Sequence, residues 1–198
     1  MTVPVVTALR SRGPGRVAVE LDHGPWRVVP LEAVYVAGLA VGRELDRASA
    51  RALRREIRRV EAREVAVRAL RACDHTTASL AQRLVDRGTA AAVRQETIEA
   101  AQRAGLVDDQ RFAAQRASLL AARGGGDLLI VDDLERHGVP AEAARHAIDA
   151  LEPEAARARA IVAARGTSPK TARYLAAKGF SEATLETVVA DLVTDGLG

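Results

Sequence analysis

The sequence predicts an all-α protein preceded by a small β-containing module, and three observations support this. Alanine and arginine dominate the 198 residues, with 41 alanines and 27 arginines, and both residue types lose little entropy in a helix. From residue 45 onward no alternating strand pattern occurs, and glycines and prolines recur at intervals that suit helices of about ten to fifteen residues. Three of these glycines also have matching neighbours, which indicates an internal repeat.

The N-terminal segment, residues 1–45, differs from the rest of the chain. β-Branched residues alternate with other types at 17–21, and a Gly-Pro pair lies on each side of this run. Period-two alternation bounded by glycine and proline is typical of short antiparallel strands. We therefore expect strands near 3–6, 17–21 and 26–29, followed by a short helix over 30–37 with a proline near its first position.

The repeat is centred on three glycines that follow leucines at a fixed distance. A leucine lies four residues before each glycine, and a β-branched aliphatic residue lies ten residues after it. This pattern is typical of a helix that ends at a left-handed glycine, then a tight turn, then an amphipathic helix. The positions are Leu84, Gly88 and Ile98, then Leu134, Gly138 and Ile148, then Leu175, Gly179 and Val189.

Further helical sequence precedes each of these turns, at 60–72, 109–122 and 154–165. Three-helix units of this kind bury their apolar faces against their neighbours and usually form a curved array. The predicted architecture is therefore three tandem three-helix repeats forming a curved elongated body. Residues 46–107 are expected to form a basic helix and the first repeat. The second repeat is expected at 108–152 and the third at 153–198.

The net charge of +3 is unevenly distributed. Residues 46–72 carry nine arginines against four acids, whereas residues 124–198 carry eight cations against twelve acids. On a helical wheel, Arg47 and four further arginines fall within an arc of about 100°. The opposite face, by which the helix is expected to pack, carries Leu53, Ile57, Val60 and Val67. Guanidinium groups presented this way suit phosphates. The candidate contact residues are Arg51, Arg54, Arg55 and Arg58; a solvated face with intrahelical ion pairs is the alternative.

Catalytic chemistry has no support in the sequence. Cys73 and His75 lie close together, but no base or oxyanion site accompanies the thiol. Asp74 and Thr76 or Thr77 are better explained as the N-cap of the following helix. We therefore expect no enzymatic activity.

Metal and cofactor binding are not expected either. The pairs Asp108-Asp109 and Asp132-Asp133 could supply carboxylates to Mg²⁺, but neighbouring carboxylates on a helix point about 100° apart. Asp109 precedes a helical tract and is predicted as its N-cap. The four histidines show no metal-ligand spacing. We predict no metal and no cofactor.

Targeting and membrane segments are not apparent. The N-terminus lacks the basic start and apolar core of a signal peptide, and the longest apolar stretch, 33–41, is far shorter than the roughly 20 residues of a membrane helix. The single cysteine excludes a disulfide framework. We expect a cytoplasmic, monomeric protein with no membrane partner.

Four tracts along the chain match the pattern of one known family. The tract 105–113, GLVDDQRFA, is similar to GLIDDxRFA, and 76–88 is similar to a helix of the form S-x-x-E-L-x-x-K-L-x-x-K-G. The tract 174–181, YLAAKGFS, is similar to YL-x-x-KGF-S, and 6–45 is similar to a small leader domain. Taken together and in this order, they resemble the RecX family of bacterial recombination regulators.

This resemblance implies a non-enzymatic modulator of the RecA recombinase, acting in DNA repair, homologous recombination and the SOS response. Family members bind RecA filaments on single-stranded DNA and generally restrain them. The implied fold is three tandem three-helix repeats. Within it we assign the motif residues to structure: Leu84, Gly88, Asp109, Arg111, Phe112, Leu134, Gly138, Leu175, Gly179 and Phe180.

One departure from the family pattern bears on the site. The family's second repeat usually has a basic stretch, whereas here the corresponding segment carries Asp127, Asp132, Asp133 and Glu135. The arginine-rich helix is therefore the expected basic surface. Two other classes stay open: a helical DNA-binding regulator of transcription that uses a helix-turn-helix, and a helical-repeat scaffold for a protein partner.

Overall fold

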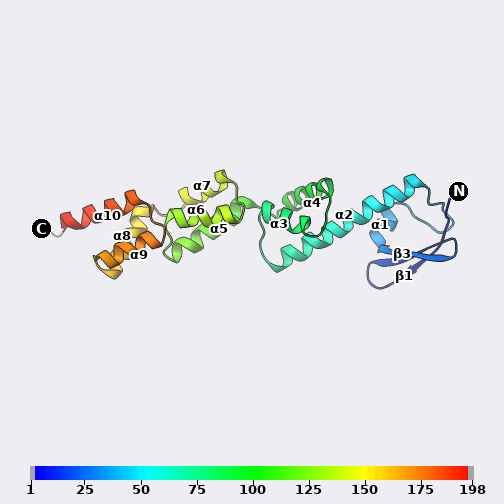
Figure 1. Ribbon diagram of the computed structural model, residues 1–198, viewed down its shortest axis with the longest axis horizontal. Coiled ribbons are helices and arrows are strands. Elements are labelled where there is room, and N and C mark those ends of the chain that lie inside the picture. The colour runs from blue at the N-terminus through cyan, green and yellow to red at the C-terminus, as the bar shows by residue number, and fades with distance from the viewer. Residues whose placement is uncertain (1–2, 196–198) are drawn as a thin grey trace. The chain divides into compact units, whose positions relative to one another are not determined.

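The computed structural model describes residues 3–195, with side chains described as far as Val188. Three strands and ten helices lie in this range (Figure 1). They form two compact units. The N-terminal unit combines Met1–Cys73 with Ala81–Arg103, and the C-terminal unit combines Asp74–Leu80 with Ala104–Gly198. The predicted class, mostly helical with a small N-terminal sheet, is confirmed; the curved array of repeats stays a prediction.

The sheet has three antiparallel strands in the order β1-β2-β3. They are β1 (Val6–Ser11), β2 (Arg16–Leu21) and β3 (Gly24–Pro30). Asp22 and His23 join β2 to β3 with φ of 50° and 66°. Positive φ at both central residues gives a two-residue hairpin whose twist matches that of the strands. The strands predicted at 17–21 and 26–29 are confirmed.

The first strand lies later in the chain than the sequence suggests. It begins at Val6, the last residue of the predicted 3–6 segment, and Val5 instead forms an isolated bridge with Glu44. The position of β1 is set by its pairing with β2, in which Leu9 lies opposite Val19. Because the bridge from Val5 to Glu44 joins residues 39 positions apart, no local pattern shows that Val5 lies outside β1.

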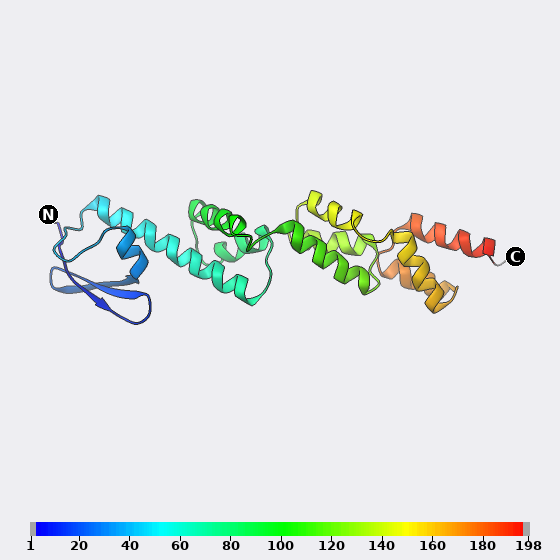
Figure 2. The ribbon, with the colours of Figure 1, turned by 180° about the vertical axis from the view of Figure 1, so that it is seen from behind.

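Two helices cover one face of the sheet, as Figures 1 and 2 both show. They are α1 (Leu31–Val36) and the first half of α2 (Arg47–Ala72). Burial of large aliphatic side chains is the main stabilising contribution of such a module. Its core includes Val6, Val17, Val19, Val29, Leu53, Ile57 and Val60.

The second half of α2 is buried through a different face. Ala62, Ala66 and Ala69 are buried there, and they lie on the side of the helix opposite Leu53. Helix α4 (Ala91–Arg103) packs against α2. Val67 was predicted on the buried face, and this prediction is wrong: the side chain is 43% exposed because α2 changes its buried face before reaching it.

The C-terminal unit contains two groups of three packed helices, besides the start of α3 (Thr77–Val85). Each group has its own small core, rich in alanine. The predicted segments 109–122 and 154–165 coincide with α5 and α8. The groups are α5 (Asp109–Ala122), α6 (Asp127–Arg136) and α7 (Ala141–Asp149), then α8 (Glu154–Arg165), α9 (Pro169–Ala177) and α10 (Glu182–Asp195).

The three repeat glycines end their helices as expected. Their φ values are +71°, +69° and +78° for Gly88, Gly138 and Gly179. In each turn, the residue after the glycine donates its N–H to the carbonyl of the repeat leucine, which lies five residues before this donor. The distances are 3.0, 3.0 and 3.2 Å. This bond closes a Schellman turn. Ile98 is buried and Ile148 half-buried, whereas the side chain of Val189 lies outside the described residues.

Candidate polyanion interface

The candidate interface is the arginine face of α2, formed by Arg51, Arg54, Arg55 and Arg58. All four side chains are exposed, while Leu53 on the other side of the helix is fully buried. The helix begins at an Asp46 N-cap, whose carboxylate accepts the Ser49 N–H at 2.7 Å. This hydrogen bond lowers the pKa of Asp46. The structure thus places all four predicted residues on one exposed face.

Ion pairs neutralise little of the arginine face. Within residues 3–188, Arg51, Arg54 and Arg58 make no ion pair, and Arg55 contacts only Glu56, at 3.3 Å. The Arg55 side chain is still 61% exposed. The alternative of a face neutralised by intrahelical ion pairs therefore applies to Arg55 alone.

A neighbouring arginine, Arg59, forms the ion pairs with the nearby acids Glu56 and Glu96. Arg59 donates to both carboxylate oxygens of Glu96, at 2.8 and 3.0 Å, and to Glu56 at 3.0 Å. The hydrogen bond with Glu96 raises the pKa of Arg59, and the same bond lowers the pKa of Glu96. Because Arg59 engages these two carboxylates, the arginine face remains a concentrated positive surface.

The charge of the whole chain divides between the two units. The N-terminal unit holds 18 Lys and Arg against 11 Asp and Glu, a net charge of +7. The C-terminal unit holds 11 against 15, a net charge of −4. A polyanion is therefore attracted first to the N-terminal unit, where the arginine face lies.

The motif residues at 108–112 act in structure, with one correction. The N-cap of α5 is Asp108, whose side chain accepts the Arg111 N–H at 2.9 Å, so the prediction that Asp109 caps this helix is wrong. Asp109 instead accepts the N–H of Thr77 at 2.7 Å, at the start of α3. Phe112 packs against the ring of His137, with centroids 5.7 Å apart.

The start of α3 forms a tight junction with the turn after α6. Thr76 caps α3, as expected, by accepting the Ser79 N–H at 3.0 Å, and its hydroxyl donates to the His137 carbonyl at 2.6 Å. A Cβ on Gly138 would lie 2.5 Å from the Cβ of Ala78. Gly138 is therefore required by its close neighbour as well as by its φ.

A second junction has the same construction, between the start of α6 and the turn after α9. The N–H of Leu128 donates to the Gly179 carbonyl at 3.0 Å, and a Cβ on Gly179 would lie 2.6 Å from Leu129. Glu154, at the start of α8, accepts the Asp127 N–H at 2.7 Å, as Asp109 accepts that of Thr77. An acid at one helix start thus caps an earlier helix in both places.

Sequence reasoning missed the polar cluster behind the second junction. Arg157 donates to the Gly125 carbonyl at 2.6 Å and pairs with Asp127, while Glu154 accepts the hydroxyls of Ser181 and Thr184 at 2.6 and 2.7 Å. Burial raises the pKa of Asp127. Burial also acts to raise the pKa of Glu154, but hydrogen bonds led by Ser181 outweigh it and lower the pKa. The cluster joins the turn before α6 to the starts of α6, α8 and α10, and no spacing in the sequence links these segments.

The second acidic pair also serves in ion pairs. Asp133 is buried and accepts two hydrogen bonds from Arg116, at 2.7 and 2.9 Å, which lower its pKa. Asp132 pairs with Arg136 at 2.9 Å. Among the described residues, no group of three or more His, Cys, Asp or Glu side chains is placed to hold a metal ion.

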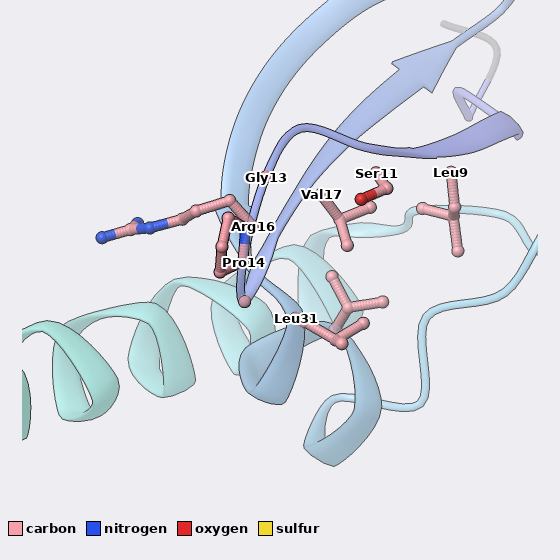
Figure 3. Close-up of a pocket in the computed structure, with 9 residues that line it drawn as sticks. Leu9, Ser11, Gly13, Pro14, Arg16, Val17 and Leu31 are labelled. Atoms are coloured by element: carbon pink, nitrogen blue, oxygen red, sulfur yellow. The ribbon is translucent and has the colours of Figure 1, made fainter.

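An apolar hollow of about 560 Å³ lies beside the β1–β2 hairpin (Figure 3). Leu9, Val17 and Leu31 contribute to its wall, and Ser11 supplies a hydroxyl. Arg16 points away from these side chains and pairs with Glu64 at 3.0 Å. A ligand site needs several convergent polar groups, and this hollow offers few, so we assign it no ligand.

Comparison with known proteins identifies the family. A regulatory protein RecX from Chromohalobacter salexigens is 34% identical over 127 residues, which cover 60% of this chain and 84% of that relative. The chain belongs to the RecX family. No family model matches the chain.

Two solved RecX structures share the fold. A crystal structure of regulatory protein RecX aligns with a TM-score of 0.74 and 18% identity, covering 95% of this chain and all of that one. RecX from Lactobacillus salivarius aligns with a TM-score of 0.61 and 16% identity, covering 69% and 97%. Within this RecX fold, the motif residues Asp109, Gly138 and Gly179 hold helix junctions together. Within residues 3–195, no helix has the length and apolar character needed to cross a membrane.

Proposed function

We propose that this chain binds RecA filaments on single-stranded DNA and restrains RecA activity in homologous recombination, DNA repair and the SOS response. Membership of the RecX family carries this proposal, because the relative of which the chain covers 84% is a regulatory protein RecX. The protein is proposed to act as a cytoplasmic monomer, without catalysis and without a cofactor.

The arginine face of α2 is proposed to contact the filament or its DNA. It presents three guanidinium groups without an ion pair in residues 3–188, in a unit of net charge +7. Guanidinium groups bind phosphates by paired hydrogen bonds and by releasing condensed counterions. Binding through this face should therefore weaken steeply as salt rises.

The test follows ATP hydrolysis by RecA assembled on poly(dT) while purified protein is added. We expect the steady-state rate to fall with added protein, and the protein to sediment with the filament. An unchanged rate without co-sedimentation would contradict the proposal. Binding to specific duplex sequences would favour a transcription regulator, and binding to RecA without DNA would favour a scaffold.

The arginine face has a matched pair of variants. Arg54→Gln/Arg58→Gln removes two exposed charges, while Arg12→Gln/Arg27→Gln removes two others from the same unit, also exposed and without an ion pair in residues 3–188. Loss of two phosphate contacts should reduce the salt slope of binding to the filament by about 1.4, and the control should leave the slope unchanged. Equal slopes for both variants would overturn this site.

A further inference from the structure

A second basic surface lies inside the acidic C-terminal unit. From Ala155 to Ser181 the chain carries six cations and no acid, although the unit as a whole has a net charge of −4. Both lysines of the chain, Lys170 and Lys178, lie in this segment. The excess is local, and the average charge of the unit conceals it.

The cations of this segment divide into one internal arginine and an outer set. Arg157 is almost fully buried and is held by Asp127 and by the carbonyls of Gly125 and Glu152. Arg159 has an interaction of its own. The remaining cations, which make no ion pair within residues 3–188, are Arg165, Lys170, Arg173 and Lys178.

The ring of Tyr174, on α9, contacts two of these cations, Arg165 and Lys178. Lys170, Tyr174 and Lys178 are spaced by four residues, so they form one row along the helix, while Leu175 on the inner side is buried. The guanidinium of Arg165, from the end of α8, lies 4.0 Å from the centroid of the Tyr174 ring, and the Lys178 Nζ lies 5.8 Å from it. The ring attracts both cations and offsets part of their mutual repulsion.

We propose that this surface, the tyrosine-centred patch of Arg165, Lys170, Tyr174 and Lys178, binds the phosphodiester backbone of single-stranded nucleic acid. Eight residues of helix span about 12 Å, so cations at the two ends of this row can contact different phosphates of one strand. The stacked Arg165 is restrained on the ring, so it loses less side-chain entropy when its guanidinium meets a phosphate.

This inference rests on the proposed function only in that both place the chain on single-stranded DNA. The arginine face and the tyrosine-centred patch lie in different units.

The two lysines allow a direct test, since they and the N-terminal amine are the only primary amines of the chain. The full-length protein is acetylated with an amine-selective reagent, with and without a fluorescein-labelled dT oligonucleotide, and the sites are quantified by mass spectrometry. We expect the oligonucleotide to slow modification of Lys170 and Lys178 at least severalfold. Equal rates with and without DNA would overturn the proposal.

Binding of the same oligonucleotide, followed by anisotropy, gives the second measurement. Lys170→Gln/Lys178→Gln should weaken binding and lower the salt slope by about 1.4, Lys170→Arg/Lys178→Arg should restore both, and Arg12→Gln/Arg27→Gln should change neither. If the lysine variant binds as the natural chain does while Arg54→Gln/Arg58→Gln does not, the patch fails and the proposed function stands. If the natural chain does not bind the oligonucleotide, or if only acidic peptides protect the lysines, the patch is not a nucleic-acid site.

Discussion

The N-terminal unit and the C-terminal unit use charged residues in different ways. In the N-terminal unit, valine, leucine and isoleucine form the core around α2, and Arg51, Arg54 and Arg58 on its exposed face make no ion pair within residues 3–188. In the C-terminal unit the cores are rich in alanine, and charged groups such as Asp133 and Glu154 lie between helices. Side chains that hold helices together are not available to bind a partner. Exposed charges without an ion pair are therefore candidates for binding, whereas charged groups between helices stabilise the fold.

The largest expected effect tests how far the N-terminal unit depends on its aliphatic core. Leu53→Ala removes a fully buried side chain and should lower the free energy of unfolding by about 2–5 kcal/mol. Val67→Ala on the same helix should change it by less than about 0.5 kcal/mol, because that side chain is exposed. Urea titration followed by fluorescence of Trp26, the single tryptophan, reports on this unit. Similar losses for both variants would contradict the change of buried face along α2.

The second comparison sets a glycine at a helix junction against a glycine in open space. Gly179→Ala adds a Cβ that would lie 2.6 Å from Leu129, whereas a Cβ on Gly88 would meet nothing within 4 Å. Both substitutions incur the strain of positive φ, about 1 kcal/mol. Gly179→Ala should cost about 2 kcal/mol more, measured by urea titration followed by circular dichroism. Equal losses of unfolding free energy for the two variants would show that the backbone around Leu129 moves to accommodate the added Cβ.

The smallest effect concerns the buried ion pair of the C-terminal unit. Because Arg116 lowers the pKa of Asp133 below its ordinary 3.8, the pair stabilises the folded state fully above pH 3.8. This contribution is lost as the pH falls through the lowered pKa. Asp133→Asn should cost about 1–3 kcal/mol at pH 7 and less at pH 2, measured by urea titration at both values.

The arginine face supplies the matching comparison for pH. Arg54→Gln/Arg58→Gln should leave stability almost unchanged at either pH, since neither side chain contacts an acid in residues 3–188. A cost for Asp133→Asn that did not shrink on acidification would show that packing, and not charge, accounts for that residue.

Much of the fold follows from local sequence. The glycine turns at Gly88, Gly138 and Gly179, the strands at 17–21 and 26–29 and the bounds of α5 and α8 were all predicted, because each depends on residues within one turn, strand or helix. The arginine face followed from helical periodicity for the same reason. That face stays a proposed site, although its geometry agrees with the prediction.

The errors at Asp109 and Val67 involve a distant partner. Asp109 has the sequence of an N-cap, but its carboxylate caps a helix that begins 32 residues earlier. Val67 continues the apolar period of α2, but a different helix face is buried there. The cluster around Arg157 and Glu154, which the sequence did not indicate, joins the turn before α6 to α6, α8 and α10, and no regular spacing along the chain links its residues.

The sequence by itself determined the helical class, the N-terminal sheet, the glycine turns, the family resemblance and the uneven charge, because these depend on residue type and local periodicity. Only the tertiary structure decided which charges are internal and which are presented. Of the nine arginines in 46–72, Arg59 joins two acids while Arg51, Arg54 and Arg58 remain exposed. Of the six cations in 155–181, Arg157 is internal, whereas Arg165 and Lys178 lie over the ring of Tyr174. An ion pair depends on the distance between two folded elements, and that distance is set by packing.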